Sequence, residues 1–413
     1  MILLLYYILL LYYVVLTKDK SIARLLIILQ IISLSGIFLI DADYEINSLF
    51  KVFNLLFTIV VMTIIILPWR NIVGIAGIKV HDEIKLKRLT YTIIGISIIP
   101  FIIFSAVSAF VLIYVDDINN FKYAENVAQD FYYSLPINKY LLIASIHIYD
   151  VCYFLIPLHL YYLSKRQFKL SLACFVLSLT LPLHGLMFFS RASFVSYFML
   201  YISMLYILYG TLDYSTRINI KKFSIVSLLG LASYFLYISN SRFVGDLSYA
   251  ETIPSTSFLQ NPVLYSYFDY LSQAYKNGMH VLNLYNFETF TGLVSLQSLF
   301  GLMGHFGILN FNPAELMAMR QKLWPDNWYT FNGFVAYSVY DYGYFLTIAF
   351  SLIYLRIILT MKVINRSISI VDLFILVLLI QIPLASIFYS VVSGLIFSFI
   401  FLMIITIYLK MKV

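Results

Sequence analysis

The sequence predicts an all-α polytopic membrane protein with about eleven transmembrane helices, within a range of 10–12, and one large extracytoplasmic loop. Hydrophobic residues make up 62% of the 413 residues, and the mean hydropathy is +0.90. Charged residues make up only 11%, whereas soluble domains carry about 25%. A water-soluble fold could not bury this much apolar surface, so the bilayer is the expected solvent.

The apolar residues are gathered into runs, and about 20 such residues cross the hydrocarbon layer as a helix. Because backbone groups in lipid must be satisfied internally, each run is expected to be helical. The first run has neither a basic segment before it nor a small-residue cleavage site, so it is expected to be a retained span. The predicted runs are 2–16, 22–40, 49–69, 90–115, 140–163, 170–189, 192–210, 223–238, 333–359, 370–389 and 391–409.

Lys and Arg alternate between the two sides of these runs, and cytoplasmic loops carry the excess. One side collects 19 of the 27 basic residues, and the acidic residues show the opposite bias. This pattern predicts an outside N-terminus, a cytoplasmic C-terminus and an outer large loop. The net charge of +7 is thereby explained by topology, and no nucleic-acid partner is expected.

The polar, aromatic segment 240–332 divides the chain. We expect an N-terminal bundle over 1–239 with about eight spans, the extracytoplasmic loop over 240–332, and three C-terminal spans over 333–413. Within the loop, 291–311 is apolar but contains Gln297 and His305, and a full crossing there would invert every later basic cluster. It is therefore expected to be an interfacial or re-entrant helix.

Several classes of function receive no support from the sequence. Cys152 and Cys174 lie in predicted spans and form no metal or redox motif, so they are expected to pack in the core. The six histidines show no zinc-binding spacing, and no phosphate-binding or dinucleotide motif is present. We therefore expect no metal and no cofactor. Internal repeats and pore motifs are absent from the sequence, which disfavours transporters and channels.

The stretch NWYTFNGFVAYSVYDYG, residues 327–343, leads from the loop into a predicted span. It resembles the Asn…Tyr-Thr…Asp-x-Gly pattern of Wzy-type O-antigen and capsular repeat-unit polymerases. The junction FFSRAS, residues 188–193, is similar to their Ser-Arg-small-Ser element. The resemblance extends to length, span number and a late outer loop.

This resemblance implies a metal-independent glycosyltransferase in the bacterial cytoplasmic (inner) membrane. Its donor and acceptor would be undecaprenyl-diphosphate-linked oligosaccharide repeat units, joined on the periplasmic or extracellular face. A flippase and a chain-length regulator of the same pathway would be its partners. An O-antigen ligase shares the layout and stays an alternative.

Three arginines on the predicted outer side could bind the diphosphate, because a guanidinium is permanently charged and bidentate. They are Arg191, Arg242 and Arg320. A headgroup contact or a snorkelling side chain is the other interpretation of each.

Deprotonation of the attacking hydroxyl requires a base whose pKa is near the working pH, for which histidine is the usual choice. His280 and His305 are the main candidates, and Glu315 is a weaker one. Asp341 lies about two turns inside a predicted span, where ionisable groups face a cavity or a partner. It is predicted to bind the acceptor or orient an arginine. Asp150 and His147 also lie within a predicted span and are weaker candidates for such a role.

Trp324, Trp328 and Tyr329 form an aromatic cluster before the ninth span. Aromatic faces stack on sugar rings, but Trp and Tyr also gather at membrane interfaces. The acidic group Asp41, Asp43 and Glu45 favours another alternative, a lipid-phosphosugar-dependent transferase of the GT-C type. A lipid-linked oligosaccharide flippase is a further alternative, although charged residues within the spans are scarce.

Overall fold

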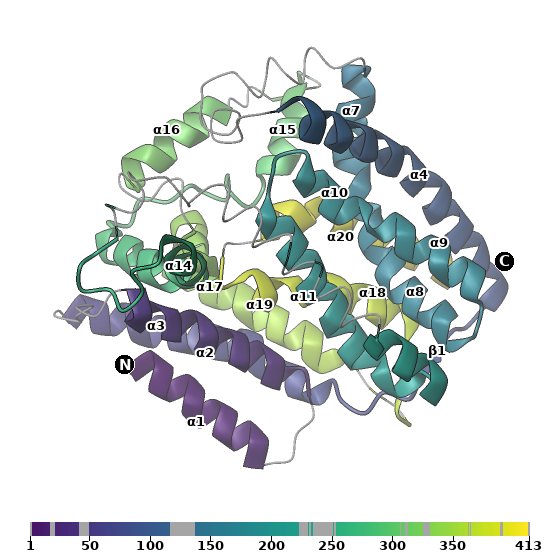
Figure 1. Ribbon diagram of the computed structural model, residues 1–413, viewed down its shortest axis with the longest axis horizontal. Coiled ribbons are helices and arrows are strands. Elements are labelled where there is room, and N and C mark those ends of the chain that lie inside the picture. Colours follow the sequence, from purple (N-terminus) through teal and green to yellow (C-terminus); the bar gives the residue numbers. More distant parts are fainter. Residues whose placement is uncertain are drawn as a thin grey trace. The chain divides into compact units, whose positions relative to one another are not determined.

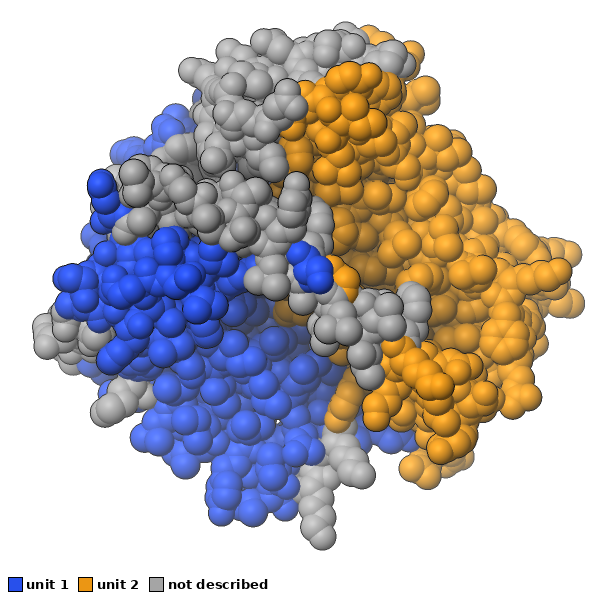
Figure 2. Space-filling model, in the orientation of Figure 1, with its two compact units in different colours: residues 1–74, 232–363, 379–396 blue, residues 75–231, 364–378, 397–413 orange. Residues whose placement is uncertain are grey.

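The protein is mainly helical in its computed structural model (Figure 1). The structure describes residues 2–16, 21–40, 49–115, 137–222, 230, 233, 251, 253–305, 307–309, 313–324, 331–361, 363, 365–388 and 391–411, without the side chains of 49, 50, 139, 191, 305, 313, 314 and 393. The chain divides into two compact units (Figure 2). The first contains Met1–Gly74, Ala232–Val363 and Leu379–Ile396, and the second contains Ile75–Leu231, Ile364–Leu378 and Phe397–Val413.

Seven helical segments of the described chain are long and apolar enough to cross a membrane. They are Ala23–Ile40, Lys51–Asn71, Glu83–Tyr114, Tyr140–Ser164, Phe168–Leu186, Ala192–Thr211 and Gly333–Thr360. Shorter apolar helices occupy Ile2–Leu16, Ile370–Ala385 and Ile396–Lys410. These segments fall on predicted runs, which confirms the helical, membrane-type character of the chain. The run 223–238 lies outside the described residues except at 230 and 233, so the number eleven stays a prediction.

The first unit is a helical bundle that includes the whole described part of the segment 240–332. Its elements are α1 (Ile2–Leu16), α2 (Ala23–Ile40), α3 (Leu49–Ile66), η1 (Leu67–Asn71), α14 (Pro262–Leu284), α15 (Gln297–His305), α16 (Pro313–Leu323), α17 (Gly333–Thr360), α19 (Gln381–Ala385) and η4 (Val392–Leu395). Helix α14 packs against α2, α3 and α17. Gln30 contacts Tyr275, Ser33 contacts Leu271 and Gly36 lies beside Ser272, so α14 runs antiparallel along α2.

Local sequence explains why α14 begins where it does. The side chain of Asn261 accepts hydrogen bonds from the backbone N–H groups of Val263 and Leu264, and Pro262 occupies the first turn. Hydropathy alone does not predict a helix here, because the segment is less apolar than a span.

The second unit is also helical and contains one pair of short strands among its described residues. Its elements are β1 (Gly77–Lys79), α4 (Glu83–Tyr114), α7 (Lys139–Ile148), η2 (Tyr149–Phe154), α8 (Leu155–Ser164), α9 (Phe168–Ser178), α10 (Thr180–Leu186), α11 (Arg191–Leu208), η3 (Tyr209–Thr211), β2 (Ser367–Ser369), α18 (Ile370–Leu379) and α20 (Ile396–Lys410). Strands β1 and β2 pair in parallel, with Gly77 opposite Ser367. Residues 214–222 form a further helical stretch.

Prolines explain why three predicted spans are not single straight helices. A proline has no N–H for the carbonyl four residues earlier, and its ring crowds that carbonyl. Four residues before Pro157 the chain is in the 3₁₀ turn η2, four residues before Pro182 helix α9 ends, and four residues before Pro383 helix α18 ends. Each break therefore has a local cause in the sequence.

Candidate functional site

Helix α17 contains a break at Gly343, within the motif that suggests a polymerase. Gly343 has φ 77° and ψ 171°, a conformation that is essentially restricted to glycine. The carbonyls of Tyr340 and Asp341, just before the break, accept hydrogen bonds from the loop that follows α14. The donors are the N–H of Phe290 at 2.7 Å and the N–H of Gly292 at 3.0 Å. The break thus provides a docking edge for the segment 290–292.

The Asp341 carboxylate completes this joint. Its Oδ1 accepts from the N–H of Val294 at 3.1 Å, and its Oδ2 accepts from the N–H of Ser295 at 2.7 Å. The side chain is buried. The turns at 291–296 lead into α15, so the carboxylate lies before the N-terminus of that helix, where a negative charge is favourable. Asp341 therefore acts as a cap for a segment distant in sequence.

Aromatic rings fill the space around the joint. The ring of Trp324 is fully buried, and its centroid lies 5.2 Å from that of Phe290 and 5.3 Å from that of Tyr340. Tyr337 contacts the same indole at 5.0 Å, and Tyr285 packs on Tyr340 at 4.9 Å. The Trp324 Nε1 has no hydrogen-bond partner among the described residues. In this structure Trp324 packs the loop onto α17, and its predicted contact with sugar remains untested.

Arg320 is the one predicted diphosphate ligand whose side chain the structure describes. Its Nη2 donates to Gln297 Oε1 at 3.3 Å, which links α16 to the start of α15. Its Nε is buried and has no partner among the described residues. Nearby in sequence, Lys322 forms an exposed ion pair with Glu288 at 3.3 Å. Arg320 thus joins the two helices of this segment, and its buried Nε is an unpaired donor among the described residues.

A polar stripe, defined by five residues, runs along α14 with helical spacing. Gln273 Nε2 donates to Asp269 Oδ2 at 2.7 Å within it. Burial raises the pKa of Asp269, against the opposing effects of Gln273 and then Lys276. The predicted base His280 is exposed at one end. The polar stripe consists of Asp269, Gln273, Lys276, Asn277 and His280.

The opposite face of α14 is fixed in the bundle by buried polar contacts. Tyr275 donates to Gln30 Oε1 on α2, and its hydroxyl lies 3.1 Å from that of Tyr7 on α1. Asn54 on α3 donates to the carbonyl of Leu282 at 3.0 Å. A buried polar network whose hydrogen bonds are all satisfied favours a single arrangement of its helices. These contacts therefore fix the rotation of α14 and the direction in which the polar stripe faces.

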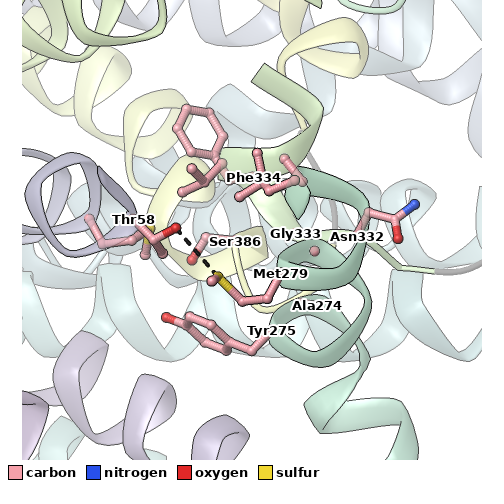
Figure 3. Close-up of a pocket in the computed structure, with 13 residues that line it drawn as sticks. Thr58, Ala274, Tyr275, Met279, Asn332, Gly333, Phe334 and Ser386 are labelled. Carbon is pink, nitrogen blue, oxygen red and sulfur yellow. Dashed lines mark hydrogen bonds between the residues drawn. The ribbon is translucent and has the colours of Figure 1, made fainter. Parts of the chain in front are cut away.

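A small cavity of about 20 Å³ lies between α14, α3 and the start of α17 (Figure 3). Thr58, Met279 and Ser386 are among its lining residues, and the Thr58 hydroxyl lies 3.9 Å from the Met279 sulfur. The volume is enough for about one water molecule and no more. A Cβ at Gly278 would lie 2.4 Å from the Asn332 carbonyl oxygen. We therefore interpret this place as a close helix contact and not as a substrate site.

The remaining predicted site residues are distributed over both units. His305 and Arg191 are described in backbone only, at the C-terminal end of α15 and the first residue of α11. Glu315 is exposed on α16, and Asp150 is buried in η2. The ring of His147 packs on Phe397 at 5.0 Å. Six of these residues lie outside the described chain: Arg242, Trp328, Tyr329, Asp41, Asp43 and Glu45.

Most of the polar stripe was missed at the sequence level, although its signal was present. Asp269, Gln273, Lys276 and His280 recur at intervals of three or four residues, which places them on one helical face. Of these residues, only His280 is of a type that by itself suggests a general base. Among the described residues, no three His, Cys, Asp or Glu side chains gather in a possible metal site.

The chain matches no protein-family model, no curated protein and no solved structure. Its function is therefore argued from its own residues.

Proposed function

We propose that the protein polymerises undecaprenyl-diphosphate-linked oligosaccharide repeat units into O-antigen or capsular polysaccharide on the outer face of the bacterial cytoplasmic membrane. The growing glycan leaves its lipid diphosphate and is transferred to a hydroxyl of the next lipid-linked unit. The substrates, the enzyme class and the membrane face all belong to this proposal.

The observation that carries the proposal is the joint at Asp341 and Gly343. These are the two residues of the Asp-x-Gly part of the polymerase-like motif, and they hold the loop segment 290–295 on α17. A short motif match is weak by itself, but here both of its distinctive residues have a shared physical task. Together they attach a polar segment to a candidate membrane span. An enzyme that acts on a lipid-linked sugar needs such an attachment, because its substrate has a part in the membrane and a part outside it.

The reaction needs two activated groups. The acceptor hydroxyl attacks the anomeric carbon, the bond from that carbon to the diphosphate oxygen breaks, and the hydroxyl proton passes to a base. In the proposal His280 takes the proton, because it is exposed on the polar stripe of a helix that the bundle holds firmly. His305 stays the second candidate.

Undecaprenyl diphosphate leaves with the bonding electrons, so its negative charge must be stabilised. Arg320 is proposed to supply donors, and Arg191 and Arg242 stay the other predicted diphosphate ligands. The bond of Arg320 to Gln297 orients its guanidinium. Arg320→Lys should recover only part of the activity lost in Arg320→Ala, since an ammonium cannot reproduce bidentate binding.

A deletion strain provides the test in cells. With a polymerase removed, the surface glycan should shorten to a single repeat unit, and the wild-type gene should restore long chains. Long undecaprenyl-linked glycans that never reach the surface would instead assign the protein as a ligase.

Complementation with His280→Ala should fail while the variant protein is present at normal levels. His81→Ala is the matched control, because His81 is likewise exposed but lies in the second unit, before α4. Equal complementation by both variants would exclude His280 as the base and leave His305→Ala as the next variant to test.

A further inference from the structure

The second unit contains a larger cavity of about 550 Å³ that the proposed reaction does not use. It lies between α8, α9, α11 and the helical stretch 214–222. This volume is in the range typical of ligand pockets. Arg166 and Phe168, in and beside the connection between α8 and α9, line the cavity, and this connection joins the ends of two candidate spans.

The walls of the cavity are apolar and partly exposed. Phe168 and Leu172 are one helical turn apart on α9, with 58% and 61% of their surfaces exposed. Phe175 and Ile220 continue the same wall. Large apolar side chains left open in this way favour an occupant with a hydrocarbon part.

The polar groups at the inner end are already satisfied by one another. His159 is buried, and its Nδ1 lies 3.0 Å from the Ser171 carbonyl oxygen. Its Nε2 lies 2.9 Å from the hydroxyl of Tyr201, and the ring of Phe175 packs on the imidazole at 5.2 Å. No described polar atom at the inner end of the cavity lacks a hydrogen-bond partner. This end of the cavity can therefore accommodate a hydrocarbon chain without leaving a polar group unsatisfied.

Basic side chains flank the cavity: Arg166 lines it, and Lys169 and Lys222 each lie within one turn of a lining residue without being among them. Arg166 is bound on one side to Asp213 at 2.8 Å, while its side chain is 70% exposed. Lys169 is one turn before Leu172, and Lys222 is one turn after the lining residue Asn219. Neither lysine forms an ion pair with a described residue. A pocket flanked by basic residues, at the ends of candidate spans, is typical of anionic lipid headgroup sites.

We propose that this cavity binds an anionic phospholipid of the adjacent leaflet. An acyl chain lies against Phe168, Leu172 and Phe175, and the phosphate is near Lys169, Lys222 and the free side of Arg166. The site is separate from the proposed polymerase chemistry and does not depend on it. Charge complementarity, combined with the satisfied inner end, favours an anionic lipid over a soluble anion.

The test uses the purified full chain in nanodiscs of phosphatidylcholine, with phosphatidylglycerol titrated as the probe and binding followed by native mass spectrometry. We expect saturable retention of phosphatidylglycerol. Lys169→Gln and Lys222→Gln should each weaken it about fivefold, the factor that matches about 1 kcal/mol per cation near a membrane surface. Lys87→Gln with Arg88→Gln is the control, because both residues are exposed in the same unit but neither lies within one turn of a residue that lines the cavity.

A second pair of variants examines the hydrocarbon part. Phe168→Ser with Leu172→Ser should weaken retention of phosphatidylglycerol, while near-native circular dichroism shows that the helices persist. Equal retention of phosphatidylcholine, or an equal loss in the Lys87/Arg88 control, would overturn the proposal. Competition by glycerol 3-phosphate as strong as that by phosphatidylglycerol would also overturn it, by showing that a soluble anion occupies the site.

Discussion

The sequence predicts that the Asp341 carboxylate, which lies inside a predicted span, has a binding partner, and the structure identifies that partner. Both oxygens accept backbone N–H groups, from Val294 and from Ser295. Depth in a span could be predicted from the hydropathy pattern, because charges there are costly without a partner. The partners could not, since they are backbone groups some 46 residues away whose position depends on the bend at Gly343.

Asp341→Asn should loosen the loop before it affects anything else. An amide replaces one acceptor oxygen with a donor, so one of the two loop N–H groups loses its bond, at a cost of about 1–3 kcal/mol. Amide hydrogen exchange should then become faster at residues 290–296 than in the wild type. Unchanged exchange together with lost activity would contradict this positioning role and favour direct catalysis by Asp341.

Gly343→Ala should have a similar effect for a different reason. A side chain at φ 77°, ψ 171° is strained by about 1–3 kcal/mol, so the break in α17 is disfavoured. The same exchange measurement should report faster exchange at the docked loop. Protection equal to that of the wild type would mean that the break does not hold the loop.

Asp269 should make stability depend on pH. Burial raises the pKa of its carboxyl above that of the unfolded chain, so its protonated form is favoured in the fold. The stability it contributes is present at low pH and is lost as the pH rises through the raised pKa. The thermal unfolding midpoint of Asp269→Asn should therefore be higher than that of the wild type at neutral pH, and the difference should disappear at acidic pH.

Asp213 gives the opposite sign and serves as the control. Its pKa is lowered, first by its hydrogen bond with Thr216 and then by Arg166. The stability that the ionised Asp213 carboxylate contributes is present at neutral pH and is lost as the pH falls through the lowered pKa. Asp213→Asn should therefore be less stable than the wild type at neutral pH and approach it in acid. Parallel pH profiles for the two variants would contradict both assignments.

Among the elements, the apolar runs could be located from composition, but their interruptions required a second principle. The breaks before Pro157, Pro182 and Pro383 have a cause in the missing proline N–H, but Pro100 lies inside the continuous helix α4, so a proline alone does not predict a break. Helix α14 was missed for another reason: its polar stripe lowers the local hydropathy, and only its 3.6-residue period distinguishes it from a loop. Its burial among α2, α3 and α17 is a tertiary result that no local pattern contains.

Gly278 should be essential to the packing of α14. A methyl group there would meet the Asn332 carbonyl oxygen at 2.4 Å, so Gly278→Ala should destabilise the protein by about 1–3 kcal/mol, as overpacking does. Gly301→Ala is the matched control, because a Cβ at that helical glycine meets no atom within 4 Å. Unfolding in detergent, followed by tryptophan fluorescence, should separate the two variants. Equal stability would show that α14 and the start of α17 are not in close contact.

For the whole molecule, the Lys and Arg distribution predicts a sidedness that cysteine labelling can check. Cys152 and Cys174 are buried, so the wild type should react little with a membrane-impermeant maleimide. Ser255→Cys and Gln321→Cys should react in intact spheroplasts, because both positions are exposed and predicted to be outside. Lys165→Cys and Lys221→Cys should react only after the membrane is opened. The reverse labelling would place the polar stripe on the cytoplasmic side and contradict the outer-face reaction.

The central claim is that this chain joins lipid-linked repeat units, and a reconstituted reaction tests it most directly. Purified protein in proteoliposomes is given undecaprenyl-diphosphate-linked repeat units and excess EDTA, and the glycans are separated by size. The account predicts a ladder whose rungs differ by one repeat unit, and no ladder with His280→Ala. An unextended repeat unit in every condition would contradict polymerisation, and a ladder that appears only after magnesium or manganese is restored would contradict the metal-independent reaction.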